Sequence, residues 1–278
     1  MTSLLEAALA AVGVQVERSI VDLGLRGCVV GRPSDGRRAL ITMVGPDPAS
    51  TALAEHSGWD LPLRSLEPIE TASGPRTMLV EDLAVGVPSI GDGAPRPIGP
   101  NVPAYVPAVA ERVATAHARG ETVGWLHPAL VLVDPDSLDL VAVAQRPLRA
   151  SLAAPAGEGS APLFGLAYLA PSDVRNRPAT IADDVHRLAA LVWRWRHGSA
   201  PFAGVSEAEH LHLLAGAASG PPIGGRGRAA AVDRPMDDLD GLLAKAIQPD
   251  ARDRPTARDI VAALATAGAG WRTEADGT

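Results

Sequence analysis

Two glutamates and two histidines lie close together in the segment EAEHLH, which supplies Glu207, Glu209, His210 and His212. Carboxylates and imidazoles of this kind are common ligands of zinc and related metals. The two histidines are two residues apart, so they leave a helix on different faces and chelate one ion poorly. We therefore predict a solvated helix here and no metal site. Cys28, the single cysteine, supplies neither an intrachain disulfide nor a cysteine-based zinc site.

The charge balance narrows the class of partner. Lys and Arg total 25 against 32 Asp and Glu, which gives a formal charge of −7, and Lys245 is the only lysine. Nucleic-acid binding requires a basic surface that neutralises phosphates, so no nucleic-acid partner is predicted. The first residues lack the cationic start of a signal peptide, and no apolar run approaches the ~18 residues of a transmembrane helix. We expect a cytoplasmic protein without a membrane partner.

Short runs of β-branched and aliphatic residues dominate the first part of the chain, after a short helix expected over 3–12. Glycines and a Pro33–Gly36 turn separate the runs, a pattern typical of an antiparallel meander. The predicted strands cover 14–23, 28–32, 38–44 and 76–83, with one or two helical turns over 49–57. A proline-rich stretch without sustained periodicity follows, which is typical of a hinge or linker.

Helical spacing replaces this pattern in the rest of the chain. Thr256 and Asp259 form a capping box that opens the last helix. Apolar residues recur at helical spacing over 106–116, 185–195, 239–247 and 260–264, and a small hairpin is predicted within 125–144. The chain therefore divides into a helical extension (1–13), a β-rich lobe (14–86), a Pro-rich linker (87–104), a helical lobe (105–266) and a tail (267–278). The predicted fold class is α+β.

Five short motifs, in this order, resemble the protein-kinase fold over roughly residues 18–266, especially that of bacterial Ser/Thr kinases. TMLVEDLAVG (77–86) is similar to the strand and hinge that face the adenine, and HARG (117–120) to the helix end before the catalytic loop. YLAPS (168–172) resembles the Y-x-A-P-E motif. DDVHRLAALVWRWRHGSAPFAG (183–204) and AIQPDARDRPTARDIVAAL (246–264) resemble two later helical segments. The resemblance implies a bilobal fold with a small antiparallel β N-lobe and a larger helical C-lobe.

The resemblance also shows which catalytic groups are missing. Kinases need a Lys on the third strand, and that position falls on Ile41 or Thr42. The Asp that binds the metal should fall near 142–146, where the sequence AVAQR contains no acid. The hydroxyl of Thr42 and the aliphatic side chain of Ile41 carry no charge, so neither replaces the charged groups that a kinase uses. Magnesium–ATP binding is therefore disfavoured, and no cofactor is predicted.

The catalytic-loop positions lack an acid as well. Aligned without gaps from Gly120, residues 123–125 stand where the kinase H-R-D stands, so that Trp125 replaces the proton-accepting Asp. Leu130 then replaces the metal-binding Asn. A shifted alignment puts His127 on the family's His, but Ala129 on the catalytic Asp. In either register the proton-accepting Asp is missing, because a Trp, Ala or Leu side chain neither accepts a proton nor binds magnesium.

Four residues match family positions whose roles are structural: Glu81, Pro171, Asp184 and Arg254. The resemblance implies that Asp184 accepts hydrogen bonds from the catalytic-loop backbone. It also implies that Arg254 is the partner of the glutamate in A-P-E, a position that Ser172 holds here. Arg254 must then find another acceptor or solvent.

The leading hypothesis is a catalytically inactive pseudokinase that acts as a protein-binding, scaffold or allosteric module for other signalling proteins in bacteria. The alternative is a divergent ATP-dependent Ser/Thr kinase or other nucleotide-dependent transferase. Its relocated groups would be Asp134, Asp136 or Asp139 together with Arg37 or Arg38. A third possibility is metal-independent nucleotide binding that serves only as a switch.

Overall fold

A computed structural model describes most of the chain, and it divides into two compact units. The first, the sheet unit, includes described residues of Met1–Gly93, Ala129–Pro135 and Val141–Gly165. The second, the helical unit, includes those of Ala94–Pro128, Asp136–Leu140 and Leu166–Thr278. The structure describes residues 3–23, 26–44, 61–71, 74–89, 102–145, 166–175, 177–202, 205–215, 237–252 and 254–267. The helical turns predicted over 49–57 lie outside these residues.

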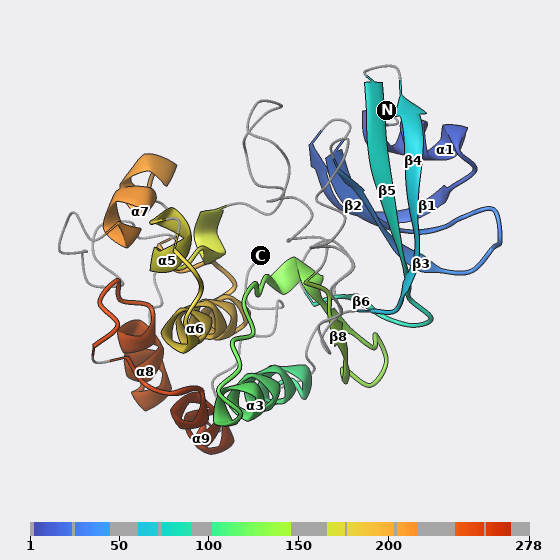
Figure 1. The fold of residues 1–278 in the computed structure, drawn as a ribbon. Helices are drawn as coiled ribbons and strands as arrows, with labels where there is room; N and C mark the ends of the chain where they lie inside the picture. The colour runs from blue at the N-terminus through green and yellow to red at the C-terminus, as the bar shows by residue number, and fades with distance from the viewer. Residues whose placement is uncertain are drawn as a thin grey trace. The chain divides into compact units, whose positions relative to one another are not determined.

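The sheet unit is built on a five-stranded antiparallel sheet with the order β1-β2-β3-β5-β4 (Figure 1). Its strands are β1 (Gln15–Leu23), β2 (Arg26–Arg32), β3 (Ala39–Val44), β4 (Leu63–Thr71) and β5 (Gly74–Asp82). Four of them coincide with predicted strands. β4 was not predicted, because its sequence LRSLEPIET alternates weakly and contains Pro68, a residue that usually argues against a strand.

The short helix α1 (Leu4–Ala11), which lies within the helical extension predicted over 1–13, is grouped with this unit by its contacts. Ser3 and Glu6 form a capping box that starts the helix. Leu5 and Leu9 are buried in one hydrophobic cluster with inward residues of the sheet such as Ile41. Their burial explains why the segment joins the sheet: two leucines contribute about 1.5–3 kcal/mol each when fully removed from water.

A second sheet has the order β6-β7-β8, with β6 (Val87–Pro88), β7 (Val131–Val133) and β8 (Leu140–Val143). The last two strands form the hairpin predicted within 125–144. The sequence assigned this hairpin to the helical lobe, whereas contacts group Ala129–Pro135 with the sheet unit. The reason is the antiparallel pairing of β6 with β7, which ties the hairpin to the strand that follows β5.

The helical unit packs its helices around α6 (Ile181–His197), which contacts α3 (Tyr105–Ala118), α8 (Asp238–Ala246) and α9 (Ala257–Thr266). Figure 1 shows α3, α6, α8 and α9 as neighbouring helices. The unit also contains α5 (Pro171–Val174), α7 (Glu207–Leu214) and η2 (Leu166–Tyr168). The short helix η1 (Pro128–Leu130) begins at the last residue of one segment of this unit and continues into residues grouped with the sheet unit. α6 ends at Gly198 in the left-handed conformation, and α9 begins with the predicted Thr256–Asp259 capping box.

The two units together make the fold α+β, as predicted. Among the described residues, no helix combines the length and the apolar character that a membrane crossing requires.

Candidate functional site

The segment that follows α3 corresponds to the predicted catalytic loop, and Asp184 holds its backbone. Asp184 lies in the first turn of α6 and is fully buried. Its carboxylate accepts hydrogen bonds from the backbone N–H groups of Val123 (2.5 Å) and Gly124 (2.8 Å). His117, near the end of α3, lies with Nε2 3.1 Å from the same carboxylate. A buried carboxylate with these partners fixes the path of the chain between α3 and η1.

Arg187 extends this network inside the helical unit. One turn after Asp184, its side chain is fully buried and lies 3.3 Å from the Asp184 carboxylate and 2.6 Å from that of Asp173. Its guanidinium also lies 4.9 Å from the ring centroid of Trp125, a cation–π contact. The position equivalent to the catalytic Asp in the gapless alignment is thus an aromatic ring stacked on an arginine.

The other side chains over residues 122–130 are apolar or neutral, and Arg119 and Glu121 before them form an exposed ion pair with each other. Val123, Leu126 and Leu130 are buried. His127 packs edge-on against Tyr168, with ring centroids 4.7 Å apart. Burial lowers the pKa of His127 to about 3 and raises that of Tyr168 to about 12, so both rings are neutral near pH 7. His127 is therefore a poor proton acceptor in the range in which a general base works.

In the sheet unit, Thr42, one of the two positions predicted to match the kinase lysine, is part of a buried polar patch, whereas Ile41, the other, lies in the hydrophobic cluster. Thr42 pairs with Cys28 across β3 and β2, and its hydroxyl lies 3.4 Å from the Cys28 sulfur. Burial raises the pKa of the Cys28 thiol to about 12, so it stays protonated and unreactive. The carboxylate of Glu81 on β5 is fully buried, and its charge also raises the pKa of this thiol. The sheet face that bears Thr42 is opposite to the one that Leu5 and Leu9 cover.

The cations considered for a relocated active site have carboxylate partners within the sheet unit. Arg37 lies 3.1 Å from Asp82, and Arg38 lies 2.8 Å from Glu17. Asp136 and Asp139 lie exposed at the turn between β7 and β8. Among the described residues, no three His, Cys, Asp or Glu side chains are placed to hold one metal ion. Within EAEHLH, His210 is buried against Phe202, whereas His212 is exposed.

The remaining structural positions lie around α5 and the turn before α9. Pro171 is buried at the first turn of α5, where its missing N–H costs nothing. Arg254 donates to the backbone carbonyls of Ala182 (2.5 Å) and Gln248 (2.7 Å). Backbone carbonyls, rather than a carboxylate, are therefore the acceptors that the structure gives Arg254. Burial lowers the pKa of Arg254, and the guanidinium has no ion-pair partner within hydrogen-bond distance among the described residues.

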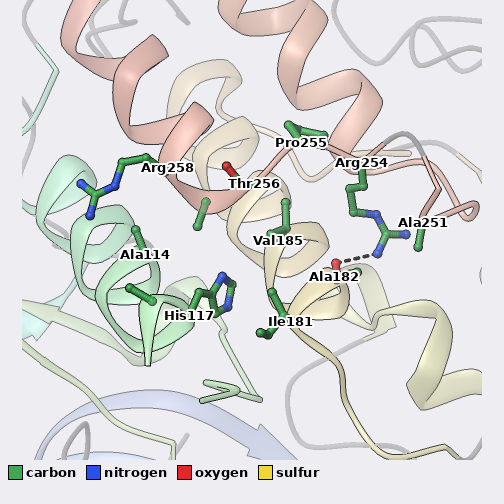
Figure 2. A pocket seen from close by; sticks show the side chains of 12 residues that line it. Ala114, His117, Ile181, Ala182, Val185, Ala251, Arg254, Pro255, Thr256 and Arg258 are labelled. Atoms are coloured by element: carbon green, nitrogen blue, oxygen red, sulfur yellow. Dashed lines mark hydrogen bonds between the residues drawn. The ribbon is translucent and has the colours of Figure 1, made fainter. Parts of the chain in front are cut away.

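A groove of about 440 Å³ opens beside this arginine, within the helical unit. The C-terminal end of α3, the first turns of α6 and the start of α9 form its walls (Figure 2). Small apolar residues line much of it, including Ala114, Ala182 and Val185. Arg254 and Arg258 contribute the cationic part of the lining. His117 also lines it, and so connects the groove to Asp184.

A second buried arginine lies at the other end of α6 and was not anticipated from the sequence. Arg196 is 1% exposed, lies 2.7 Å from Asp240 and also pairs with Asp237. His197 lies 2.9 Å from the same Asp240 oxygen. Cations in the last turn of a helix are favoured by the helix dipole, but that local rule says nothing about distant partners. Their partners start α8, more than forty positions away, and no local pattern indicates such a pairing.

Compared with models of known protein families and with curated protein sequences, the chain matches none of either.

Proposed function

We propose that this protein is a catalytically inactive, kinase-like binding module that acts through protein contacts rather than phosphoryl transfer. The observation that carries the proposal is the bonding of Asp184 to the backbone of Val123 and Gly124. It favours the gapless register, in which residues 123–125 are the counterpart of H-R-D. Trp125 then occupies the position of the base, and its ring contacts Arg187.

The electrostatics of the candidate site support the same conclusion. Phosphoryl transfer depends on cations and metal ligands that stabilise charge on the transferred group. Thr42 occupies one of the two candidate lysine positions and contacts a thiol that stays protonated. Arg37 and Arg38 are engaged by Asp82 and Glu17. The chain retains Asp184, whose carboxylate positions the backbone of the loop after α3. It also retains a buried arginine network that holds the helical unit together.

The test is a thermal-unfolding titration with ATP, with and without magnesium or manganese, combined with a phosphotransfer assay on the same samples. A ligand present at one hundred times its dissociation constant stabilises the folded state by about 2.7 kcal/mol, which raises Tm by several degrees. We expect no metal-dependent rise in Tm and no transfer. A metal-dependent rise accompanied by turnover that D136N or D139N abolishes would establish the enzyme alternative. A rise that chelator leaves unchanged would establish a nucleotide switch.

A further inference from the structure

The groove between α3, α6 and α9 has an apolar surface that no described residue covers. Ile181 is 39% exposed, and it is the only large hydrophobic side chain among the described residues of the helical unit that is exposed. Ala118, also exposed, continues the lining on α3. The volume of about 440 Å³ lies within the range of roughly 300–1,000 Å³ that is usual for ligand sites. Exposed apolar surface next to a cavity of this size marks a binding site more often than a surface without one.

The charges that line the groove all have one sign. Arg254 and Arg258 are the only Arg, Lys, Asp or Glu residues in the lining. Among the described residues, Arg254 donates hydrogen bonds to backbone carbonyls and to no carboxylate, and Asp183 and Asp250 act on its charge without a hydrogen bond. Arg258 pairs with Glu111 at 2.8 Å, but both side chains are about half exposed or more. Water screens such an exposed pair, so a partner's carboxylate can replace Glu111.

We propose that this groove binds a segment of a partner protein in which one or two aliphatic side chains are flanked by Asp or Glu. The small lining residues leave room for the aliphatic groups, and Arg254 and Arg258 attract the flanking carboxylates. Figure 2 shows that Arg258 and His117 approach the groove beside Ala114, whereas Arg254 approaches it near Ala182. The cations thus border the apolar lining on two sides. This inference rests on the proposed function, because it names the partner chemistry of a binding module.

The test uses fluorescence anisotropy with a short synthetic peptide that carries two leucines one helical turn apart, flanked by glutamates. Matched peptides replace the glutamates by lysines or the leucines by serines, and laurate serves as a free acyl probe. We expect only the acidic leucine peptide to bind the full chain, with weaker binding in about 0.5 M salt. Equal binding of the lysine or serine peptide would overturn the proposal. Binding of laurate without the peptide would also overturn it, because the groove would then be an acyl site.

Two pairs of variants locate the binding. A118L fills the groove from an exposed helical position where Leu is well tolerated, and T115L places the same side chain three residues earlier, outside the groove. We expect A118L to abolish binding and T115L to leave it unchanged. R258Q should weaken binding about tenfold, whereas R252Q, an exposed arginine outside the groove, should have no effect. Unchanged binding to A118L, with its Tm preserved, would refute the assignment to this groove.

The outcomes separate this inference from the proposed function. All peptide measurements are made without nucleotide, so they do not depend on phosphotransfer. If the acidic leucine peptide does not bind, the proposal of an inactive module is unaffected, but this groove is not its docking site. Turnover of magnesium–ATP would instead refute the inactive module, whatever the peptide does.

Discussion

In the sheet unit, arginines pair with carboxylates that remain accessible to water, whereas in the helical unit two arginines pair inside the core. Glu17 and Asp82 keep 29% and 32% of their side chains exposed, but Asp173 and Asp184 keep 7% or less. The interior of the sheet is therefore specified by aliphatic packing with a small polar patch. The interior of the helical unit depends on charged groups that satisfy one another.

This difference indicates which parts of the structure depend on specific buried ion pairs. A buried ion pair adds little net stability compared with a hydrophobic replacement, because both groups lose their hydration. Removing one partner is costly, however, because the other stays buried and unpaired. In this chain the buried pairs also hold the loop that follows α3, since Asp184 binds both Arg187 and the backbone of Gly124.

The largest effect is expected from R187L. The substitution removes the cation between two buried carboxylates, so the free energy of unfolding should fall by about 3–5 kcal/mol. Urea denaturation measures the loss. R37L in the sheet unit is the matched control, because its ion pair with Asp82 is exposed, and it should cost less than about 1 kcal/mol. Equal losses in the two variants would contradict the contrast between the units.

D184A should have the next largest effect. It leaves the N–H groups of Val123 and Gly124 without their acceptor, which should lower stability by about 1–3 kcal/mol. Arg187 keeps Asp173, which limits the damage. Hydrogen exchange should accelerate at residues 123 and 124 more than in β3. D139A, at an exposed turn, should change little. Loss of an activity in D139A with stability intact would instead favour the enzyme alternative.

Local signals in the sequence predicted much of the fold but few of its buried charges. Capping residues such as Thr256 and Gly198 mark helix ends directly, and apolar periodicity marks α3 and α6. β4 escaped prediction because it is largely half-exposed and contains Pro68. Distant pairing has no periodic signal, so the contact of Arg196 with Asp240 could not be predicted. The groove is formed by the packing of three helices, so the sequence could not predict it either.

Acid should weaken the helical unit more than the sheet unit, because His186 on α6 is 1% exposed and neither ring nitrogen has a hydrogen-bond partner among the described residues. Burial, with the nearby Arg254, Arg187 and His210, lowers its pKa from 6.5 to about 3, and only Asp183 acts in the opposite direction. The unfolded chain therefore binds one more proton between these values. Stability is complete above pH 6.5 and declines as pH falls toward 3.

The measurement is the free energy of unfolding between pH 4 and pH 7, with hydrogen exchange to separate the units. His186 alone contributes a slope of up to about 1.4 kcal/mol per pH unit. H186L should reduce the slope by that amount, and H212L, an exposed position on α7, should not. An identical slope in H186L and the wild type would show that this histidine is not buried in its neutral form.

The smallest effect should come from the exposed ion pairs of the sheet unit. Glu17 pairs with Arg32 at 2.7 Å and with Arg38 at 2.8 Å, and a double-mutant cycle of E17A and R32A isolates the first pair. The coupling energy should be about 0.2–1 kcal/mol at low salt, because water competes for both groups. It should nearly vanish at about 1 M salt, where the Debye length is only about 3 Å. A coupling energy above about 2 kcal/mol that persists in salt would show that this pair behaves like the buried arginines of α6. The contrast between exposed ion pairs in the sheet unit and buried ones in the helical unit would then be wrong.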